Sequence, residues 1–191
     1  MRNNGMFTIL GLAGSLRQKS YNRALLHAAQ EIAPPHVHMC IFELEGIPMF
    51  NEDLEQAGDP PAVQALKASI AEADALLIAT PEYNYSAPAV LTNAIDWTSR
   101  APKHEPSVLV HKPIAMMGAT LGEYGTVRAQ LVLRQVLASL ECYVLLKPEV
   151  LIARASEHFD GDGKLQNKQT RQAVQELIDK LIAWTELVKS V

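Results

Sequence analysis

The chain has 191 residues, a hydrophobic content of 48%, a charged content of 20% and a formal net charge of −4. These values are those of an ordinary globular protein, and the length fits one domain, residues 1–191, with a substantial core. The acidic balance and the lack of a long basic run argue against nucleic acid as a partner.

Segments with strand and helix patterns alternate along the chain. Apolar runs predict strands over 7–13, 37–44, 75–80 and 113–119, and a fifth strand within 142–153. Helical spacing of apolar residues predicts helices over 21–33, 62–73, 87–99, 127–140 and 170–188, with a long loop before the second of them. This alternation predicts an α/β fold whose parallel sheet has helices on both faces. Ligands of such sheets bind beyond the carboxyl ends of the strands, which directs attention to the loops after strands one, three and four.

The loop after the first strand is rich in small, hydroxyl-bearing and cationic residues. Backbone N–H groups at a helix start have no partners within the helix, and the helix dipole adds positive potential there. Serine and asparagine side chains can donate hydrogen bonds, and an arginine offers a charge and a planar fork. The segment is neither a P-loop nor a G-x-G-x-x-G turn, and it predicts a site for a terminal phosphate. Its residues are Gly14, Ser15, Arg17, Ser20 and Asn22.

A plain strand-to-helix turn is the competing interpretation of this loop. Serine and asparagine favour turns and helix caps without any ligand, and Ser20 is well placed to cap the helix that follows.

The loop after the third strand carries two tyrosines and an asparagine. Such residues at the mouth of a crevice suit a flat aromatic ligand with polar edges. The residues of interest are Pro81, Glu82, Tyr83, Asn84 and Ser86. Ser86 is also predicted to cap the next helix, with Pro88 in the first turn.

The loop after the fourth strand contains three glycines, Gly118, Gly122 and Gly125, and the polar residue Thr120. Glycines allow the backbone to approach a ligand closely. Because all three loops lie at one edge of the predicted sheet, they predict a single binding site.

Three segments of the chain resemble the NADPH-dependent FMN reductase family. They are Gly14–Asn22 (GSLRQKSYN), Pro81–Ser86 (PEYNYS) and Gly118–Gln130, in which Arg128-Ala-Gln130 follows the glycine-rich loop. That family includes bacterial quinone, chromate and azo-dye reductases. The resemblance implies a flavodoxin-like three-layer fold with a five-stranded parallel sheet of strand order 2-1-3-4-5.

The resemblance also implies a division of the site. Residues of the first loop would hold the FMN phosphate, those of the second would border the isoalloxazine, and those of the third would line its other side. These sets are Ser15, Arg17, Ser20 and Asn22; Pro81, Glu82, Tyr83 and Asn84, with Ser86 nearby; and Thr120 and Gly122. The chain departs from the family at Thr126, where relatives often have a second glycine.

The preferred function is an FMN-dependent oxidoreductase that passes electrons from NADPH or NADH to a small-molecule acceptor, with no metal and no protein nucleophile. A flavodoxin-type electron carrier without a nicotinamide site is the alternative. Arg17 in the phosphate loop and a net charge of only −4 favour the enzyme. A nicotinamide-binding Rossmann domain using Glu43 or Glu45 on a ribose is disfavoured because G-x-G-x-x-G is missing.

Two further segments could be mistaken for metal sites. His36 and His38 alternate along a strand, but no third ligand is near in sequence. The segment 160–163 (DGDG) resembles the start of a calcium loop, yet Lys164 and Arg171 occupy positions that need oxygen ligands. It is therefore predicted to be a surface turn.

The two cysteines, Cys40 and Cys142, exclude a disulfide framework and predict buried thiols in a reducing compartment. The first residues lack the apolar core of a signal peptide, and no apolar stretch is long enough to span a bilayer. We therefore expect a cytoplasmic protein without a membrane partner.

Self-association is also expected. Trp97 lies off the apolar stripe of its helix, which indicates a second buried face. The family resemblance implies dimers, and we expect a homodimer or homotetramer in which Arg128 and Glu149 pair between subunits.

Overall fold

The computed structural model describes residues 6–102 and 104–190. Its strands are β1 (Phe7–Ala13), β2 (Val37–Phe42), β3 (Ala75–Ala79), β4 (Pro113–Ala119), β5 (Tyr143–Val144) and β6 (Val150–Ile152). Its helices are α1 (Tyr21–Ile32), α2 (Glu52–Gln56), α3 (Pro61–Glu72), α4 (Ala89–Thr98), α5 (Val127–Ser139) and α6 (Lys168–Lys189), with a short 3-10 helix at Ala155–Glu157. No helix within the described ranges has the length and apolar character needed to cross a bilayer.

The sheet is parallel throughout and has the order β2-β1-β3-β4-β5, with β6 also paired to β4. This order confirms the predicted flavodoxin-like arrangement. Every residue of β3 and β4 is buried, because helices cover both faces of the central strands.

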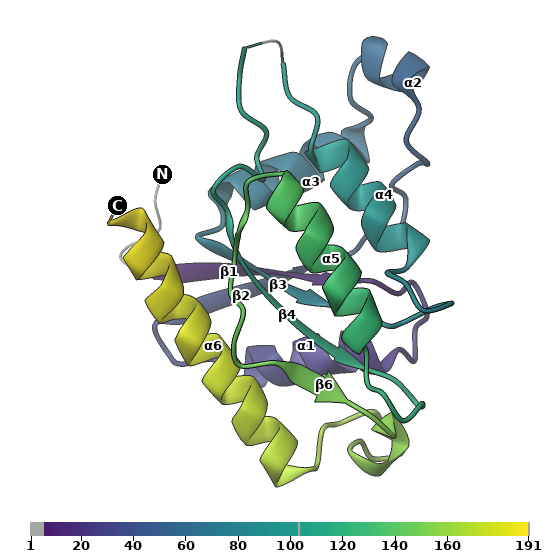
Figure 1. Cartoon of the computed structure of the whole chain (residues 1–191), viewed down its shortest axis with the longest axis vertical. Coiled ribbons are helices and arrows are strands. Elements are labelled where there is room, and N and C mark those ends of the chain that lie inside the picture. The colour runs from purple at the N-terminus through teal and green to yellow at the C-terminus, as the bar shows by residue number, and fades with distance from the viewer. Residues whose placement is uncertain (1–5, 103, 191) are drawn as a thin grey trace.

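The helices form two layers around the sheet (Figure 1). Helices α1 and α6 pack on one face, in a cluster that includes Leu25, Leu26 and Ile178. Helices α3, α4 and α5 pack on the other face, in a cluster that includes Leu66 and Leu133. Each of these five helices buries the apolar side that its sequence periodicity predicts.

The fifth strand position is filled by two short strands instead of one. The first, β5, pairs with the start of β4 at Pro113–Ile114, and the second, β6, pairs with its end at Met117–Ala119. The chain leaves the ladder between them, where Pro148 has no N–H to donate to a neighbouring strand. The prediction of one strand within 142–153 is thus correct in position and wrong in continuity.

The predicted loop between the second strand and the second helix contains a further helix, α2. Asn51 caps it, since its Oδ1 accepts a hydrogen bond from the Asp53 N–H at 2.8 Å. Three acidic residues in its first turn oppose the positive end of the helix dipole.

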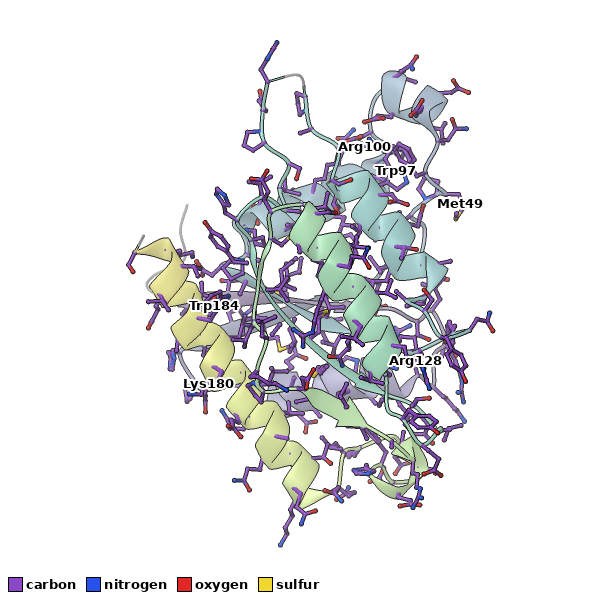
Figure 2. The ribbon with its side chains drawn as sticks, in the orientation of Figure 1. Met49, Trp97, Arg100, Arg128, Lys180 and Trp184 are labelled. Atoms are coloured by element: carbon purple, nitrogen blue, oxygen red, sulfur yellow. The ribbon has the colours of Figure 1, made fainter. Side chains whose placement is uncertain are left out.

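Trp97 is fully buried, but residues of the same chain cover it. Its Nε1 donates to the Pro48 carbonyl at 2.8 Å, and its ring meets Phe50 edge to face at 5.0 Å. Figure 2 shows Trp97 on α4 and Arg100 just beyond the end of that helix, both near Met49. The second buried face therefore exists, but the loop before α2 covers it, and Trp97 gives no support to self-association.

The cysteines have different environments. Cys142 is buried, and burial raises the pKa of its thiol to about 11. Cys40 is only half-buried, and its Sγ lies 2.9 Å from His38 Nε2. The prediction of buried thiols is confirmed for the first and wrong for the second.

Candidate functional site

Three loops meet at the carboxyl edge of the sheet and enclose a cavity of about 160 Å³. Eight of the twelve predicted residues line it, and they come from all three loops: Ser15, Arg17, Ser20, Asn22, Pro81, Glu82, Tyr83 and Thr120. Gly14, Asn84, Ser86 and Gly122 do not line it, whereas Tyr21, Ala119 and Leu121 do and were missed. These three adjoin predicted residues in the sequence, so proximity along the chain was the available signal.

The first loop presents hydroxyl groups that keep a hydrogen free. Ser15 Oγ accepts from the Arg17 N–H at 3.3 Å, and both serines of the loop are buried. Ser20 Oγ caps α1 by accepting from the Asn22 and Arg23 N–H groups at 3.2 and 3.4 Å. Neither hydroxyl donates to a protein acceptor within residues 6–102 and 104–190. Ser20 can therefore cap α1 and donate a hydrogen bond to an anion at the same time.

Arg17 adds a cation to these hydroxyls. It forms no ion pair with any residue in the described part of the chain. Two hydroxyl donors and a guanidinium at the N-terminus of α1 are the donor set that a phosphate dianion requires.

Asn22 supports the cavity from behind. Its Nδ2 donates to the Ala119 carbonyl and its Oδ1 accepts from the Ala119 N–H, both at 2.9 Å. The side chain thus ties the start of α1 to the end of β4. The predicted donation from Asn22 to a phosphate is limited to the second Nδ2 hydrogen.

Gly14 allows the first and second loops to pack together. A Cβ at this position would lie 2.8 Å from Pro88 Cγ and 3.0 Å from Pro81 Cδ. Gly14 therefore shapes the cavity without lining it.

The second loop makes a tight turn at residues 83–86. Tyr83 and Ser86 exchange backbone hydrogen bonds of 2.9 and 3.1 Å, and the two residues between them have positive φ values, 50° for Asn84 and 64° for Tyr85. Positive φ at both central positions is the pattern of a type I′ turn. A tyrosine in this conformation is strained, and such strain clusters at functional sites.

The turn also alters the start of α4. Ser86 is used in the turn and does not cap the helix, which begins at Ala89 after Pro88 and has no side-chain cap. The predicted cap at Ser86 and the predicted helix start at residue 87 are therefore wrong.

Glu82 connects the second loop to α5. Its Oε2 accepts from the N–H groups of Arg128 at 2.8 Å and Ala129 at 3.2 Å, and its Oε1 accepts from Arg128 Nη1 at 2.9 Å. The Glu82 side chain is only 10% exposed. A carboxylate in this position satisfies orphan donors and opposes the helix dipole, so Glu82 caps α5 from another loop.

The Arg128 guanidinium lies between two aromatic rings. Its Cζ is 4.0 Å from the Tyr85 ring centre and 4.7 Å from the Tyr124 ring centre. Arg128 and Glu149, which were expected to pair between subunits, both have partners within the chain: Glu82 for the first, Lys147 and Arg134 for the second.

The third loop is anchored to the strand beside it. The Thr120 N–H donates to the Ile152 carbonyl at 3.0 Å, and the Thr120 carbonyl accepts from the Ala155 N–H at 2.9 Å. The Arg154 guanidinium hydrogen-bonds Glu123 and holds the pKa of that exposed carboxyl below its usual range.

The glycines of this loop serve packing more than ligand approach. A Cβ at Gly118 would lie 2.0 Å from Thr126 Oγ1 and 2.4 Å from the Thr80 carbonyl oxygen. Gly125 has a φ of +59° and lies against the backbone of Leu151. Only Gly122 has open space beside it, with Thr120 Oγ1 at 3.9 Å as the nearest contact of a Cβ.

Thr126, where the chain departs from the resemblance, is fully buried and is accommodated because residue 118 is glycine. Its Oγ1 accepts a hydrogen bond from Gln130 Nε2 at 3.2 Å.

The comparison with protein families supports the resemblance. The model described as NADPH-dependent FMN reductase matches residues 7–157, which include all three loops.

Individual relatives agree with this match. The chain is 45% identical to an NAD(P)H-dependent FMN reductase of Pseudomonas aeruginosa over 95% of this chain and 96% of that protein. It is 39% identical to a 2-hydroxy-1,4-benzoquinone reductase of a Burkholderia species over 91% of this chain and 93% of that protein. Among solved structures it is similar to FerB, a flavoenzyme NAD(P)H:(acceptor) oxidoreductase of Paracoccus denitrificans, with a TM-score of 0.85 and 31% identity over 95% and 98% of the two chains.

Proposed function

Because this chain belongs to the NADPH-dependent FMN reductase family, we propose that its three-loop cavity binds FMN and that the chain reduces quinones with NAD(P)H. The protein is an NAD(P)H-dependent FMN or quinone reductase. FMN would supply the redox chemistry when bound, namely hydride acceptance from a nicotinamide and electron delivery to an acceptor. The proposal rests on the buried hydroxyl groups of Ser15 and Ser20, which donate no hydrogen bond to an acceptor among the described residues. Arg17 lies beside them and has no ion-pair partner among the same residues.

The chain's own residues hold and orient the cofactor. Ser15, Arg17 and Ser20 bind the phosphate, and the positive end of α1 opposes its charge. The second loop borders the ring with Pro81 and Tyr83, and the third borders it with the segment of Thr120 and Gly122. Backbone dipoles of the third loop would favour negative charge on a ring bound there.

Glu82 keeps these walls in position instead of acting on the reacting atoms. Its carboxylate is saturated by Arg128 and the first N–H groups of α5. A loop that is clamped at this point keeps the turn of residues 83–86 in place beside the cavity, which Tyr83 lines.

The order of the kinetic steps follows from a single site that the nucleotide and the acceptor share. The oxidised nucleotide leaves before the acceptor enters, so double-reciprocal plots with NADH or NADPH give parallel lines for each acceptor. Few polar contacts are available to reject an analogue, and quinones, azo dyes, chromate and free flavin are the acceptors to compare. Intersecting lines would contradict a shared site.

Flavin binding tests the phosphate loop directly. The apoprotein is titrated with FMN and with riboflavin, and flavin fluorescence reports binding. Loss of the charge-assisted bond in Arg17→Ala is expected to weaken FMN binding by about 1.5–3 kcal/mol, and riboflavin is expected to bind far more weakly than FMN. Arg100→Ala, at the end of α4 (Figure 2), is the matched control. Equal affinities for riboflavin and FMN would overturn the proposal.

We further propose that the protein works as a homodimer or homotetramer. Exposed apolar and aromatic side chains occur on the second and third loops and on α5, namely Tyr85, Leu121, Tyr124 and Leu131 at 57–70% exposure. Leu121 lines the cavity, and the rings of Tyr85 and Tyr124 lie against Arg128. Such a cluster is a candidate interface between copies of the chain. Light scattering should give a mass of at least twice 21.0 kDa, and an active particle of 21.0 kDa would refute this proposal.

A further inference from the structure

A second cavity of about 580 Å³ lies next to the phosphate loop. One wall is the first loop with the start of α1, and the other is the turn of residues 160–164. Arg17, Ser20 and Tyr21 line both this cavity and the three-loop cavity. The predicted phosphate site therefore opens into additional space at the end away from the second loop.

The second cavity has the shape of a groove along one side of α1. Ser20, Ala24 and His27 line it at the spacing of successive helical turns. From Ser20 to His27 the groove runs about 10 Å along the helix axis, at 1.5 Å per residue. On the opposite wall, a Cβ on Gly161 or Gly163 would meet nothing within 4 Å. The small side chain of Ala24 and these two glycines therefore leave the groove unobstructed between its walls.

The charges in the groove favour an anion. Four cationic side chains line it, those of Arg17, Lys19, Arg23 and Lys164, against the carboxylates of Asp160 and Asp162. Only one of the four cations has an ion-pair partner within the described chain, namely Arg23, which pairs with Glu43 at 2.7 Å. This excess is local, since the chain as a whole carries a net charge of −4.

The turn that forms the outer wall is held in place. Asp160 Oδ1 accepts from the Lys164 N–H at 2.8 Å and the Asp162 N–H at 3.0 Å, while Oδ2 accepts from Gln166 Nε2 at 2.6 Å. These hydrogen bonds hold the pKa of Asp160 below its usual range. At the base of the turn, the ring of Phe159 packs on Tyr21 with centres 5.2 Å apart.

We propose that this groove is a subsite for an adenosine phosphate. The phosphate lies between Arg17 and Lys164, and the nucleoside lies along the Ser20–His27 side of α1. The inference rests on the proposed function, because the phosphate end of a bound flavin fixes where the groove begins. Two molecules carry this chemistry to such an enzyme: FAD, whose adenylate continues directly from the flavin phosphate, and NADPH, whose adenosine carries an extra phosphate.

Lys164 is the residue to change, because it lies in the groove and outside the three-loop cavity. The variants are Lys164→Gln and Lys164→Glu. The matched controls are Lys180→Gln and Lys180→Glu, at an exposed position on α6 that Figure 2 labels and that does not line the groove.

The first measurement compares FMN and FAD on the apoprotein by flavin fluorescence. FAD should bind within about tenfold of FMN, and Lys164→Glu should weaken FAD by about three- to tenfold, as expected for a partly exposed ion pair, while changing FMN by less than about twofold. The controls should change neither.

The second measurement uses adenosine 2′,5′-bisphosphate as the probe for the nucleotide source. It should bind the FMN-loaded protein in calorimetry and compete with NADPH, and Lys164→Glu should weaken it by a similar factor. If Lys164→Glu weakens the binding of FAD alone, the groove is assigned to FAD. If it weakens the binding of adenosine 2′,5′-bisphosphate alone, the groove is assigned to NADPH.

FAD binding more than about a hundredfold weaker than FMN, together with no effect of Lys164 on the bisphosphate, would overturn the subsite and leave the proposed function intact. Failure of FMN itself to bind would overturn the proposed function, and the subsite with it.

Discussion

Replacing Glu82 tests whether this residue clamps the second loop to α5. The carboxylate accepts two backbone hydrogen bonds and one from Arg128, and it is nearly buried. Hydrogen bonds to a charged group contribute about 1.5–3 kcal/mol when one partner is removed, and the charge at the helix start adds about 0.3–1 kcal/mol. These terms overlap, so Glu82→Ala is expected to lower the free energy of unfolding by about 2–4 kcal/mol.

Glu82→Gln separates charge from hydrogen bonding. The amide oxygen still accepts from the N–H groups of α5, but the charge is lost and the NH₂ group faces the Arg128 cation. We expect about half of the loss seen for alanine, roughly 1–2 kcal/mol. Glu176→Ala, at an exposed position on α6, is the matched control and should stay within about 0.5 kcal/mol of the parent.

The assay is urea unfolding of the apoprotein followed by circular dichroism, so that flavin binding cannot mask the effect. A double-mutant cycle with Arg128→Ala should give a coupling energy above about 0.5 kcal/mol. If Glu82→Ala leaves the unfolding midpoint unchanged while FMN affinity falls, Glu82 contacts the flavin and the clamp is refuted.

Three further outcomes are expected. Gly118→Ala should destabilise the apoprotein by about 3 kcal/mol in urea unfolding, because its Cβ would meet atoms at 2.0 and 2.4 Å. Thiol titration of the folded protein at pH 8 should detect Cys40 alone, and the folded Cys40→Ser variant should give no signal. Cys142, whose pKa burial raises to about 11, should react only after unfolding. Burial alone would raise the pKa of Asp74, but hydrogen bonds from Lys189 and a backbone N–H hold it below 3.8. Its stabilising effect is therefore present above that pH and lost as the pH falls through the lowered pKa, and Asp74→Asn should flatten the acid limb of stability against pH.

The sequence predicts most of the sheet and the place of the three-loop cavity. Continuous apolar runs such as Ala75–Ala79 mark strands covered on both faces, and alternation with helices then determines a parallel sheet whose loops meet at one edge. Eight predicted residues reach one cavity for this reason alone.

Contacts between distant segments are what the sequence did not reveal. The amide of Asn22 is bound by Ala119, 97 residues away, and Glu82 is bound by Arg128, 46 residues away. Periodicity showed that α4 has a second buried face at Trp97, but it carries no information on which segment covers that face. At Ser86 a local capping preference lost to a competing turn that uses the same backbone groups.

Because Gly118 and Thr126 are in contact, substitutions are tolerated at position 126 but not at position 118. Any larger residue at 118 meets the carbonyl oxygen of Thr80 as well as Thr126, so a glycine at 126 would not free position 118 to vary. Position 126, in contrast, can lose its side chain while Gly118 stays. A glycine there would cost about 0.5–1 kcal/mol of stability through added backbone freedom at the junction of the third loop and α5. Natural variation at residue 126 can therefore change the stability of this junction without disturbing the sheet beneath it.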